Sequence, residues 1–313
     1  MSSPWIGGLR SVALDVSDLA RAEDFYTRVW HLDVAARGDG VLHLRGTGAD
    51  HHLLALHQGA AATAIRHVTF RARSRAALDE IAAATVRAGG TVVRAPAPLD
   101  EPGGGTAVTV RDPDGRVLRA VFGDATHADA HEAKDRPSRL AHVVLNSHDV
   151  EATRRFFEQA LGFTLADRTR IMAFMNCAGD HHSVALGDAD NDALNHIAFV
   201  MPDLESVMRG GGRMRDAGHA IEWGPGRHGP GDNAFNYFVG PFGEVIEYTA
   251  EVEQIDDTYV ARGPEDWKWP AGRVDQWGIS QPPTVRLKEA QRQVLFAPVA
   301  AASATDAPDA PDA

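Results

Sequence analysis

The stretch LAHVVLNSHDVEATRRFF (Leu140–Phe157) repeats the apolar and polar pattern of LRSVALDVSDLARAEDFY (Leu9–Tyr26) at almost every position. Three further segment pairs follow in the same order, and the displacement between partners drifts only from 131 to 128 residues. The pairs are ADHHLLAL with GDHHSVAL (49–56 and 179–186), RHVTF with NHIAF (66–70 and 195–199), and DGRVLRA with FGEVIEY (114–120 and 242–248). This regularity indicates a duplication that produced two similar domains.

Each half is predicted to contain the element order βαβββ twice. Apolar strands open the two halves at Val12–Val16 and Val143–Asn146. In the second half a helix is expected to begin near Asp149 as its N-cap, with Phe156 and Leu161 on its apolar stripe. The closely spaced strands favour antiparallel pairing. The sequence therefore predicts an α+β fold of two tandem domains, each built from two βαβββ modules.

The repeat and the composition divide the chain into three parts. Residues 1–133 and 134–296 are expected to form an N-terminal and a C-terminal domain, with a polar, Pro-containing linker around residues 126–138. The repeat ends after residue 249, and an extension rich in Trp, Pro and Gly completes the second domain. Residues 297–313 are mostly Ala, Pro and Asp, a composition that cannot bury a core, so a disordered tail is predicted.

Bulk composition excludes several classes of function. The 313-residue chain has a formal net charge of −12 and no cluster of basic residues, which argues against nucleic acid as a partner. Cys177 is the single cysteine, so neither an intramolecular disulfide nor a thiolate zinc cage is expected. The sequence shows neither a secretory signal pattern nor an apolar run of the ~18 residues that a membrane span needs. A cytoplasmic protein without a membrane partner is expected.

Three residues of the second half form a candidate metal site: His142, His196 and Glu247. Each lies in a predicted strand, and two histidines with one carboxylate are the recurring ligand set of non-haem iron centres that keep positions open for substrate and oxygen. A single histidine on a strand is more often structural than a ligand. The combination, at corresponding ends of repeated strands, is what favours a metal site.

The first half provides an internal control for this assignment. The positions that correspond to the three candidate ligands carry Ser11, His67 and Arg119, and a cation such as Arg119 would repel a metal ion. The repeated fold therefore does not require a His/His/Glu set. Without its partners, His67 is interpreted as structural, and the metal chemistry is assigned to the second half alone.

Three further residues are candidates for acid–base roles beside the metal. His182 lies in HHSVAL, His228 lies in the loop GPGRHGPGDN, and Tyr237 follows in the next strand. An imidazole titrates near neutral pH and can pass a proton to bound oxygen. The first half keeps a His-His pair at residues 51–52 without a metal site, so a structural role for His182 stays open. His181 is an alternative functional member of its pair.

The chain closely resembles the type I extradiol ring-cleavage dioxygenases of the vicinal oxygen chelate superfamily. The resemblance covers roughly residues 8–290 and is strongest in LAHVVLNS, HHSVAL, LNHIAF, GPGRHGPGDNAFNYF and GEVIEYTAE. The loop and the final strand are specific motifs. The βαβββ repeat alone would not separate dioxygenases from glyoxalases or binding proteins.

The resemblance implies both an activity and a role for each site residue. His142, His196 and Glu247 match the family's ligands to Fe(II), or in some members Mn(II). His182 matches the catalytic histidine, and His228 with Tyr237 matches the pair that contacts the metal-bound oxygens. The implied substrates are a small aromatic diol (a catechol) and O2, with a muconic-semialdehyde-type product. Homo-oligomers are common in the family.

This sequence departs from the family pattern where a ring substituent is expected to lie. Some relatives carry an acidic residue three positions after the loop histidine, where this chain has glycine, and others have Arg in place of the tryptophan that precedes GPGRH. Aromatic residues on strands are more often plain core. The candidate pocket residues are Trp223, Phe235, Phe174, Asp232 and Asn233.

Two other functions remain as alternatives. A glyoxalase-like metal-dependent lyase or isomerase would ordinarily draw ligands from both halves, and Ser11 and Arg119 argue against that arrangement. A non-catalytic protein that binds a small aromatic molecule would not need the complete His/His/Glu set. The sequence therefore favours an extradiol dioxygenase.

Overall fold

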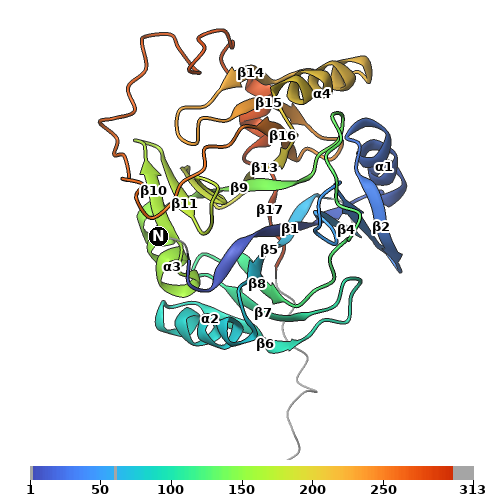
Figure 1. The fold of residues 1–313 in the computed structure, drawn as a ribbon, viewed down its shortest axis with the longest axis vertical. Helices are drawn as coiled ribbons and strands as arrows, with labels where there is room; N and C mark the ends of the chain where they lie inside the picture. Colours follow the sequence, from blue (N-terminus) through green and yellow to red (C-terminus); the bar gives the residue numbers. More distant parts are fainter. Residues whose placement is uncertain (1–2, 60–61, 299–313) are drawn as a thin grey trace, which may run out of the picture.

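The computed structural model describes residues 3–59 and 62–298. Of the disordered tail predicted for residues 297–313, the part from residue 299 onward lies outside the described residues, whereas the Ala297 amide donates a hydrogen bond of 2.8 Å to the Ile65 carbonyl. In Figure 1 the first domain occupies the right and the bottom of the view, and the second domain occupies the left and the top. Within the described ranges, each domain has the element order βαβββ–βαβββ, so the predicted α+β fold of four modules is confirmed.

The elements of the first domain begin with the long strand β1. A short helix continues there into a wider π-type turn, η1, and a second helix precedes the last three strands. In chain order the elements are β1 (Ile6–Val16), α1 (Leu19–Asp24), η1 (Phe25–Val29), β2 (Asp33–Gly38), β3 (Val41–Arg45), β4 (Leu54–Gln58), β5 (Ala64–Ala72), α2 (Arg75–Arg87), β6 (Thr91–Pro98), β7 (Thr106–Arg111) and β8 (Val117–Phe122).

The second domain repeats this order, and a short extension follows it. Its elements are β9 (Arg139–Ser147), α3 (Val150–Leu161), β10 (Thr164–Arg168), β11 (Met172–Asn176), β12 (Val184–Asp188), β13 (Leu194–Val200), α4 (Leu204–Asp216), β14 (Trp223–Arg227), β15 (Ala234–Val239) and β16 (Val245–Ala250). The extension adds α5 (Val285–Ala290) and β17 (Leu295–Phe296).

The strand order is the same in both sheets. It reads β2-β3-β4-β1-β5-β8-β7-β6 in the first domain and β10-β11-β12-β9-β13-β16-β15-β14 in the second. The sheets are mixed rather than antiparallel, because the fourth strand of each module returns beside the first and runs parallel to it, as β9 pairs with β12 and β13 with β16. The antiparallel prediction is therefore wrong at these pairings. The central strands β9, β13 and β16 carry the site.

The helix α3 follows its sequence signals closely. The side chain of Asp149 accepts a hydrogen bond from the Ala152 amide at 2.9 Å, which is the expected N-cap. The helix ends at Leu161, and the C-cap Gly162 has a φ of 70°, the left-handed conformation that glycine adopts without strain. Phe156 and Leu161 are buried as predicted. The cap and the apolar stripe together explain why the helix begins and ends where it does.

One apolar core joins the two domains. The indole of Trp30, at the end of η1, stacks on the Tyr248 ring of β16 with 3.6 Å between ring centroids. The Tyr248 hydroxyl donates a hydrogen bond of 2.9 Å to the Trp30 carbonyl, so the contact is also polar. Because β16 carries Glu247 next to Tyr248, the first domain supports the back of the strand that positions the candidate carboxylate.

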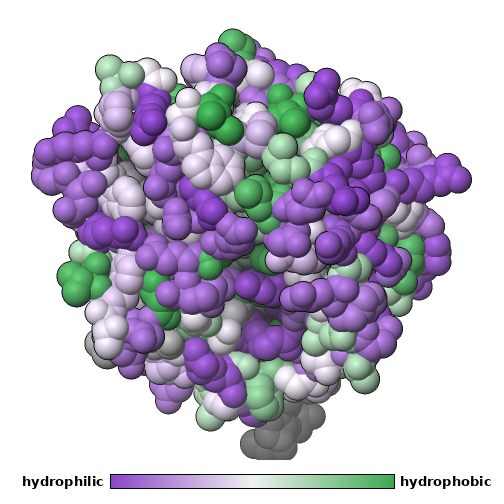
Figure 2. Space-filling model, turned by 45° about the horizontal axis from the view of Figure 1, so that its top comes forward, coloured by the Kyte–Doolittle hydropathy of each residue, from purple (hydrophilic) through white to green (hydrophobic). Residues whose placement is uncertain are grey.

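The extension after β16 wraps both domains. It passes beside β10, visible as the orange trace in Figure 1, and returns as β17, which pairs in parallel with β5 of the first domain. None of the helices within residues 3–59 and 62–298 has the length and apolar character of a membrane span. Figure 2 shows a face on which polar side chains predominate, with apolar side chains in small scattered groups.

Candidate metal centre

His142, His196 and Glu247 come from three neighbouring strands, β9, β13 and β16. The register places both His142 and Glu247 level with Ala198 of β13, one on either side. His196 lies two residues along from Ala198, and alternate residues of a strand share a face, so all three side chains project from the same face. The small Ala198 side chain leaves the space between them open.

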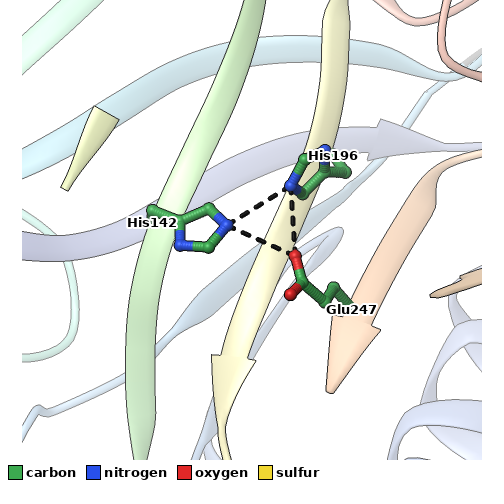
Figure 3. Close-up of side chains that lie close together, drawn as sticks. All are labelled: His142, His196 and Glu247. Carbon is green, nitrogen blue, oxygen red and sulfur yellow. Dashed lines mark hydrogen bonds and ion pairs between the residues drawn. The ribbon is translucent and has the colours of Figure 1, made fainter. Parts of the chain in front are cut away.

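The donor atoms of these three residues form a nearly equilateral triangle (Figure 3). His142 Nε2 and His196 Nε2 are 3.3 Å apart, and Glu247 Oε2 lies 3.3 Å and 3.2 Å from them, respectively. Ligands at ~2.1 Å from a metal with mutually perpendicular bonds would be about 3.0 Å apart, close to this spacing. All three side chains are buried. The triangle therefore suits one face of an octahedral ion.

The charges of the three residues also fit a divalent cation. Burial lowers the pKa of His196 to about 4, so its imidazole is neutral at neutral pH. Burial would raise the pKa of Glu247, but the surrounding imidazoles of His142, His196 and His228 outweigh it and hold this pKa well below its ordinary value. A neutral imidazole and an ionised carboxylate are the protonation states in which these groups bind metals.

Unpaired polar atoms support the same interpretation. Among the described residues, Glu247 Oε2 is buried and accepts no hydrogen bond, although two imidazole nitrogens are within 3.3 Å. A buried carboxylate oxygen without a partner is costly unless a cation neutralises it. The residues present therefore fit a bound metal ion.

Residues behind the triangle orient two of its members. His196 Nδ1 lies 2.8 Å from Asn195 Oδ1, an acceptor that keeps the proton on Nδ1 and leaves Nε2 free. Glu247 Oε1 accepts a hydrogen bond of 3.4 Å from the amide of Asn233, which also donates to Thr249 Oγ1 at 2.7 Å. Asn233 was expected in the pocket wall, but it lies behind Glu247 and orients the carboxylate.

His228 and Tyr237 form a hydrogen-bonded pair on one side of the triangle. The Tyr237 hydroxyl lies 3.0 Å from His228 Nε2 and 3.3 Å from His196 Nε2. Burial, reinforced by the charge of Glu247, raises the pKa of Tyr237 well above its ordinary value, so the phenol keeps its proton. Phe235 stacks on the His228 ring at 4.0 Å and supports it from behind.

His182 lies on the other side, with its ring centroid 4.4 Å from that of His142. Burial and the neighbouring imidazoles of His142 and His181 lower the pKa of His182 well below its ordinary value. Its ring also packs edge-on against Phe174, with 5.0 Å between centroids. The structure thus brings His182, His228 and Tyr237 together around the triangle.

These residues line a cavity of about 520 Å³, within the range of small-molecule sites. Trp223 and Phe174 line it as the sequence suggested, whereas Phe235, Asp232 and Asn233 are not among its lining residues. Trp267 and Trp269 of the extension also line it and were not identified from the sequence. The aromatic-rich run WKWP was the available signal, but its position over the cavity depends on long-range packing.

The corresponding region of the first domain holds ion pairs instead of a donor triangle. Arg119 pairs with Glu101 at 2.9 Å, and the guanidinium of Arg10 donates to Ser11 Oγ at 2.9 Å. Arg10 also pairs with the buried Asp124 at 3.1 Å. Fixed cations thus occupy the space where the second domain gathers its ligands.

A second group of potential ligands occurs among the described residues at Asp114, His148 and Asp192. The buried Arg116 guanidinium already pairs with Asp114 at 2.8 Å and with Asp192 at 2.5 Å. The arginine is already ion-paired with both carboxylates and also with Asp112, so the cluster is a structural ion-pair network between the domains.

Comparison with known proteins agrees with this geometry. A family model described as the glyoxalase/bleomycin resistance protein/dioxygenase superfamily matches residues 8–119 and 139–248. The chain is 30% identical over 223 residues to metapyrocatechase 2 of Cupriavidus necator, an alignment that covers 62% of this chain and 66% of that relative. The alignment thus spans slightly less than two thirds of the length of this curated relative.

Two further proteins are similar over more of their length. A manganese-dependent 2,3-dihydroxybiphenyl 1,2-dioxygenase of Geobacillus genomosp. 3 is 25% identical, with 74% of this chain and 80% of the relative covered. A solved Mn(II)-bound glyoxalase from Novosphingobium aromaticivorans is 32% identical, with a TM-score of 0.85 over 91% of this chain and 94% of that chain. The chain belongs to the glyoxalase/bleomycin resistance protein/dioxygenase superfamily.

Proposed function

We propose that this protein is an extradiol dioxygenase that cleaves a catecholic ring with O2 at a mononuclear metal centre held by His142, His196 and Glu247. The observation that carries the proposal is the buried triangle of donor atoms 3.2–3.3 Å apart, with an unpaired Glu247 Oε2, at the cavity that His182, His228 and Tyr237 also line. Relatives named as a metapyrocatechase and as a dihydroxybiphenyl dioxygenase support the reaction class.

The proposed metal is Fe(II), with Mn(II) as the second candidate. Two imidazoles and one carboxylate are compatible with either ion. When bound, the metal would hold the diol oxygens and O2 side by side and supply the redox chemistry. Two similar proteins are named for manganese, which supports testing both ions.

The chain's own residues would bind the ring and handle its protons. His182 lines the cavity beside His142 as a neutral imidazole, the form that can accept a proton from the diol. On the opposite side, the Tyr237 hydroxyl keeps its proton and is hydrogen-bonded to His228 Nε2. Trp223 and Phe174 supply flat apolar walls for an aromatic ring.

We propose that residues 134–296 form the catalytic domain and residues 1–133 a non-catalytic supporting domain. The support for this division is the ion-paired arrangement of Arg119 and Arg10 in the first domain, where the second gathers metal ligands. The first domain also packs against the strand that carries Glu247, through Trp30 and Tyr248. Its proposed role is therefore to stabilise the site rather than to share in it.

A glyoxalase-type activity is the second candidate, because the similar Mn(II)-bound structure is named a glyoxalase. The two reactions differ in one reactant, since a dioxygenase consumes O2 and a glyoxalase isomerises a ketoaldehyde–thiol adduct without it. The confinement of the ligand triangle to one domain favours the dioxygenase.

The experiment measures O2 uptake by protein loaded with Fe(II) or Mn(II) and mixed with a panel of catechols. We expect one O2 consumed per ring, with a yellow product formed at the same rate. A parallel anaerobic assay with a ketoaldehyde–thiol adduct tests the alternative. Turnover of the adduct without O2, together with no O2 uptake on any catechol, would exclude the dioxygenase in favour of the glyoxalase.

A further inference from the structure

A line of buried polar side chains leads from His182 away from the cavity. His182 Nδ1 lies 3.1 Å from His181 Nδ1, and His181 Nε2 lies 3.0 Å from Asp167 Oδ2 on β10. At most 2% of the surface of any of these three residues is exposed. The contacts therefore form a continuous connection that water does not interrupt.

The C-terminal extension holds the far end of this line. The Tyr259 hydroxyl lies 3.1 Å from both oxygens of Asp167, and the Arg262 amide donates to Oδ1 at 2.8 Å. The Arg262 guanidinium adds an ion pair of 3.1 Å to Oδ2. Burial would raise the pKa of Asp167, but the hydrogen bonds from His181 and Arg262 outweigh it, so the carboxyl stays ionised.

The direction of each hydrogen bond follows from the ionised carboxylate. A carboxylate only accepts, so His181 must carry its proton on Nε2, and its Nδ1 is then an acceptor when the ring is neutral. His182 Nδ1 must therefore donate, which leaves His182 Nε2 without a proton. Among the described residues no hydrogen bond to this Nε2 is formed, and His182 lines the cavity.

We propose that Asp167 and His181 are positioning residues that hold His182 as its Nδ1–H tautomer, so that an unprotonated Nε2 faces the cavity. Tyr259 and Arg262 of the extension lock the carboxylate that sets this tautomer. The catalytic consequence rests on the proposed dioxygenase function, in which His182 accepts a proton from the diol. The tautomer itself does not depend on that function.

The first domain shows that the fold does not require this arrangement. Its His51 and His52 make the same contact between Nδ1 atoms, at 3.0 Å. The strand register places Ala36 opposite His43, just as Asp167 lies opposite Phe174, so an alanine stands where the second domain has its aspartate. The carboxylate is thus an addition specific to the second domain.

The tautomer of the first-domain pair is set from the other side. The Arg10 guanidinium, which can only donate, contacts His52 Nε2 directly. The repeat aligns Arg10 with Ala141, which cannot fill the same space beside His182. In the second domain, where alanine replaces this arginine, the cavity side of His182 is open. Asp167 sets the tautomer from the opposite side, through His181.

The test compares Asp167→Asn with wild type in two measurements. In metal-free protein, two-bond ¹H–¹⁵N correlations of the imidazoles report which nitrogen of His182 carries the proton. We expect Nδ1–H in wild type and a substantial Nε2–H population in Asp167→Asn, because an asparagine amide can also donate to His181. In metal-loaded protein we expect kcat for a catechol to fall about 10- to 100-fold, with KM and bound metal changed less than about twofold.

Two further variants complete the experiment. Tyr259→Phe removes one donor to Asp167 and should shift kcat in the same direction by a smaller factor, which keeps the proposal testable if Asp167→Asn does not fold. His51→Gln, at the matched pair of the first domain, should leave kcat unchanged. His182 carrying its proton on Nε2 in wild type would overturn the proposal, as would unchanged kcat in both second-domain variants. Absence of O2 uptake by wild type would overturn only the proposed function.

Discussion

Glu247 supplies the only negative charge within the donor triangle, and its Oε2 atom has no hydrogen-bond partner among the described residues. Its other oxygen is held by Asn233, so the carboxylate is oriented without its second oxygen being used. Histidines on strands are more often structural than metal ligands, so the two imidazoles alone would not indicate a metal site. The carboxylate is what distinguishes a divalent metal site from a buried pair of histidines.

Replacing Glu247 with alanine is expected to abolish metal binding and O2 uptake together. The substitution removes the charge that offsets the cation and leaves two neutral ligands, so we expect a loss of more than about 100-fold in metal affinity. Metal analysis after gel filtration and an oxygen electrode measure the two effects. Glu222→Gln, at a buried carboxylate paired with Arg286, is the matched control. Wild-type O2 uptake by Glu247→Ala would show that the metal assignment is wrong.

Substitution of His182 should separate metal binding from turnover. Its ring lies beside His142 and lines the cavity, but it is not a corner of the donor triangle. His182→Asn is expected to retain one metal ion per chain and to lose about 10²- to 10⁴-fold in kcat, the usual contribution of a general base. Single-turnover kinetics with a metal-loaded variant measure this loss. An unchanged kcat would show that another residue, such as His228, handles the proton.

At the scale of elements, the repeat predicted more of the fold than of the cavity. The βαβββ order, the N-cap at Asp149 and the strand positions of the three candidate ligands follow from local patterns of hydrophobic spacing and capping. The parallel pairings were missed because strand direction depends on which strands become neighbours. The positions of Asp167 and Tyr259 were missed for the same reason, since their 3.1 Å contact joins residues 92 positions apart.

The extension between β16 and α5 is expected to contribute to substrate binding. Trp269 lines the cavity while remaining 42% exposed, so its removal should cost little folding stability. Loss of one aromatic contact worth about 1 kcal/mol should raise KM for a catechol roughly 3- to 10-fold in Trp269→Ala, with kcat nearly unchanged. Steady-state kinetics measure the separation. Trp277→Ala is the control, because Trp277 lies in the same extension, contacts Arg227 and does not line the cavity. Equal KM in both variants would exclude this role for Trp269.

On the scale of the whole molecule, a buried hydrogen bond ties the domains together. The Tyr26 hydroxyl of the first domain donates to Glu244 Oε1 of the second at 2.6 Å, and Glu244 Oε2 accepts from the Phe242 amide at 2.9 Å. Burial raises the pKa of Glu244, and these hydrogen bonds offset it only in part. The folded protein therefore holds a proton on this carboxyl at a higher pH than the unfolded chain does.

This difference gives the stability of the molecule a defined pH dependence. Folding takes up a proton between the ordinary pKa of the carboxyl and the raised pKa of Glu244, so the contribution of this group to the free energy of unfolding falls as pH rises through that interval. In Glu244→Gln the side chain cannot ionise and the decline should disappear. The free energy of unfolding of the variant, relative to wild type, should therefore increase with pH above the ordinary carboxyl range.

Urea unfolding of metal-free wild type and Glu244→Gln from pH 4.5 upward measures this difference. A constant offset between the two proteins reflects the change in hydrogen bonding when an amide replaces the carboxyl beside Tyr26 and Phe242, and only the slope reports the ionisation. Tyr26→Phe is the matched variant: losing the phenol removes a contact that lowers the pKa of Glu244, so the decline should move to higher pH. Parallel pH profiles for all three proteins would mean that Glu244 ionises in the folded state as it does in the unfolded chain. A shifted profile in Tyr26→Phe would instead locate the linkage at the contact between the two domains.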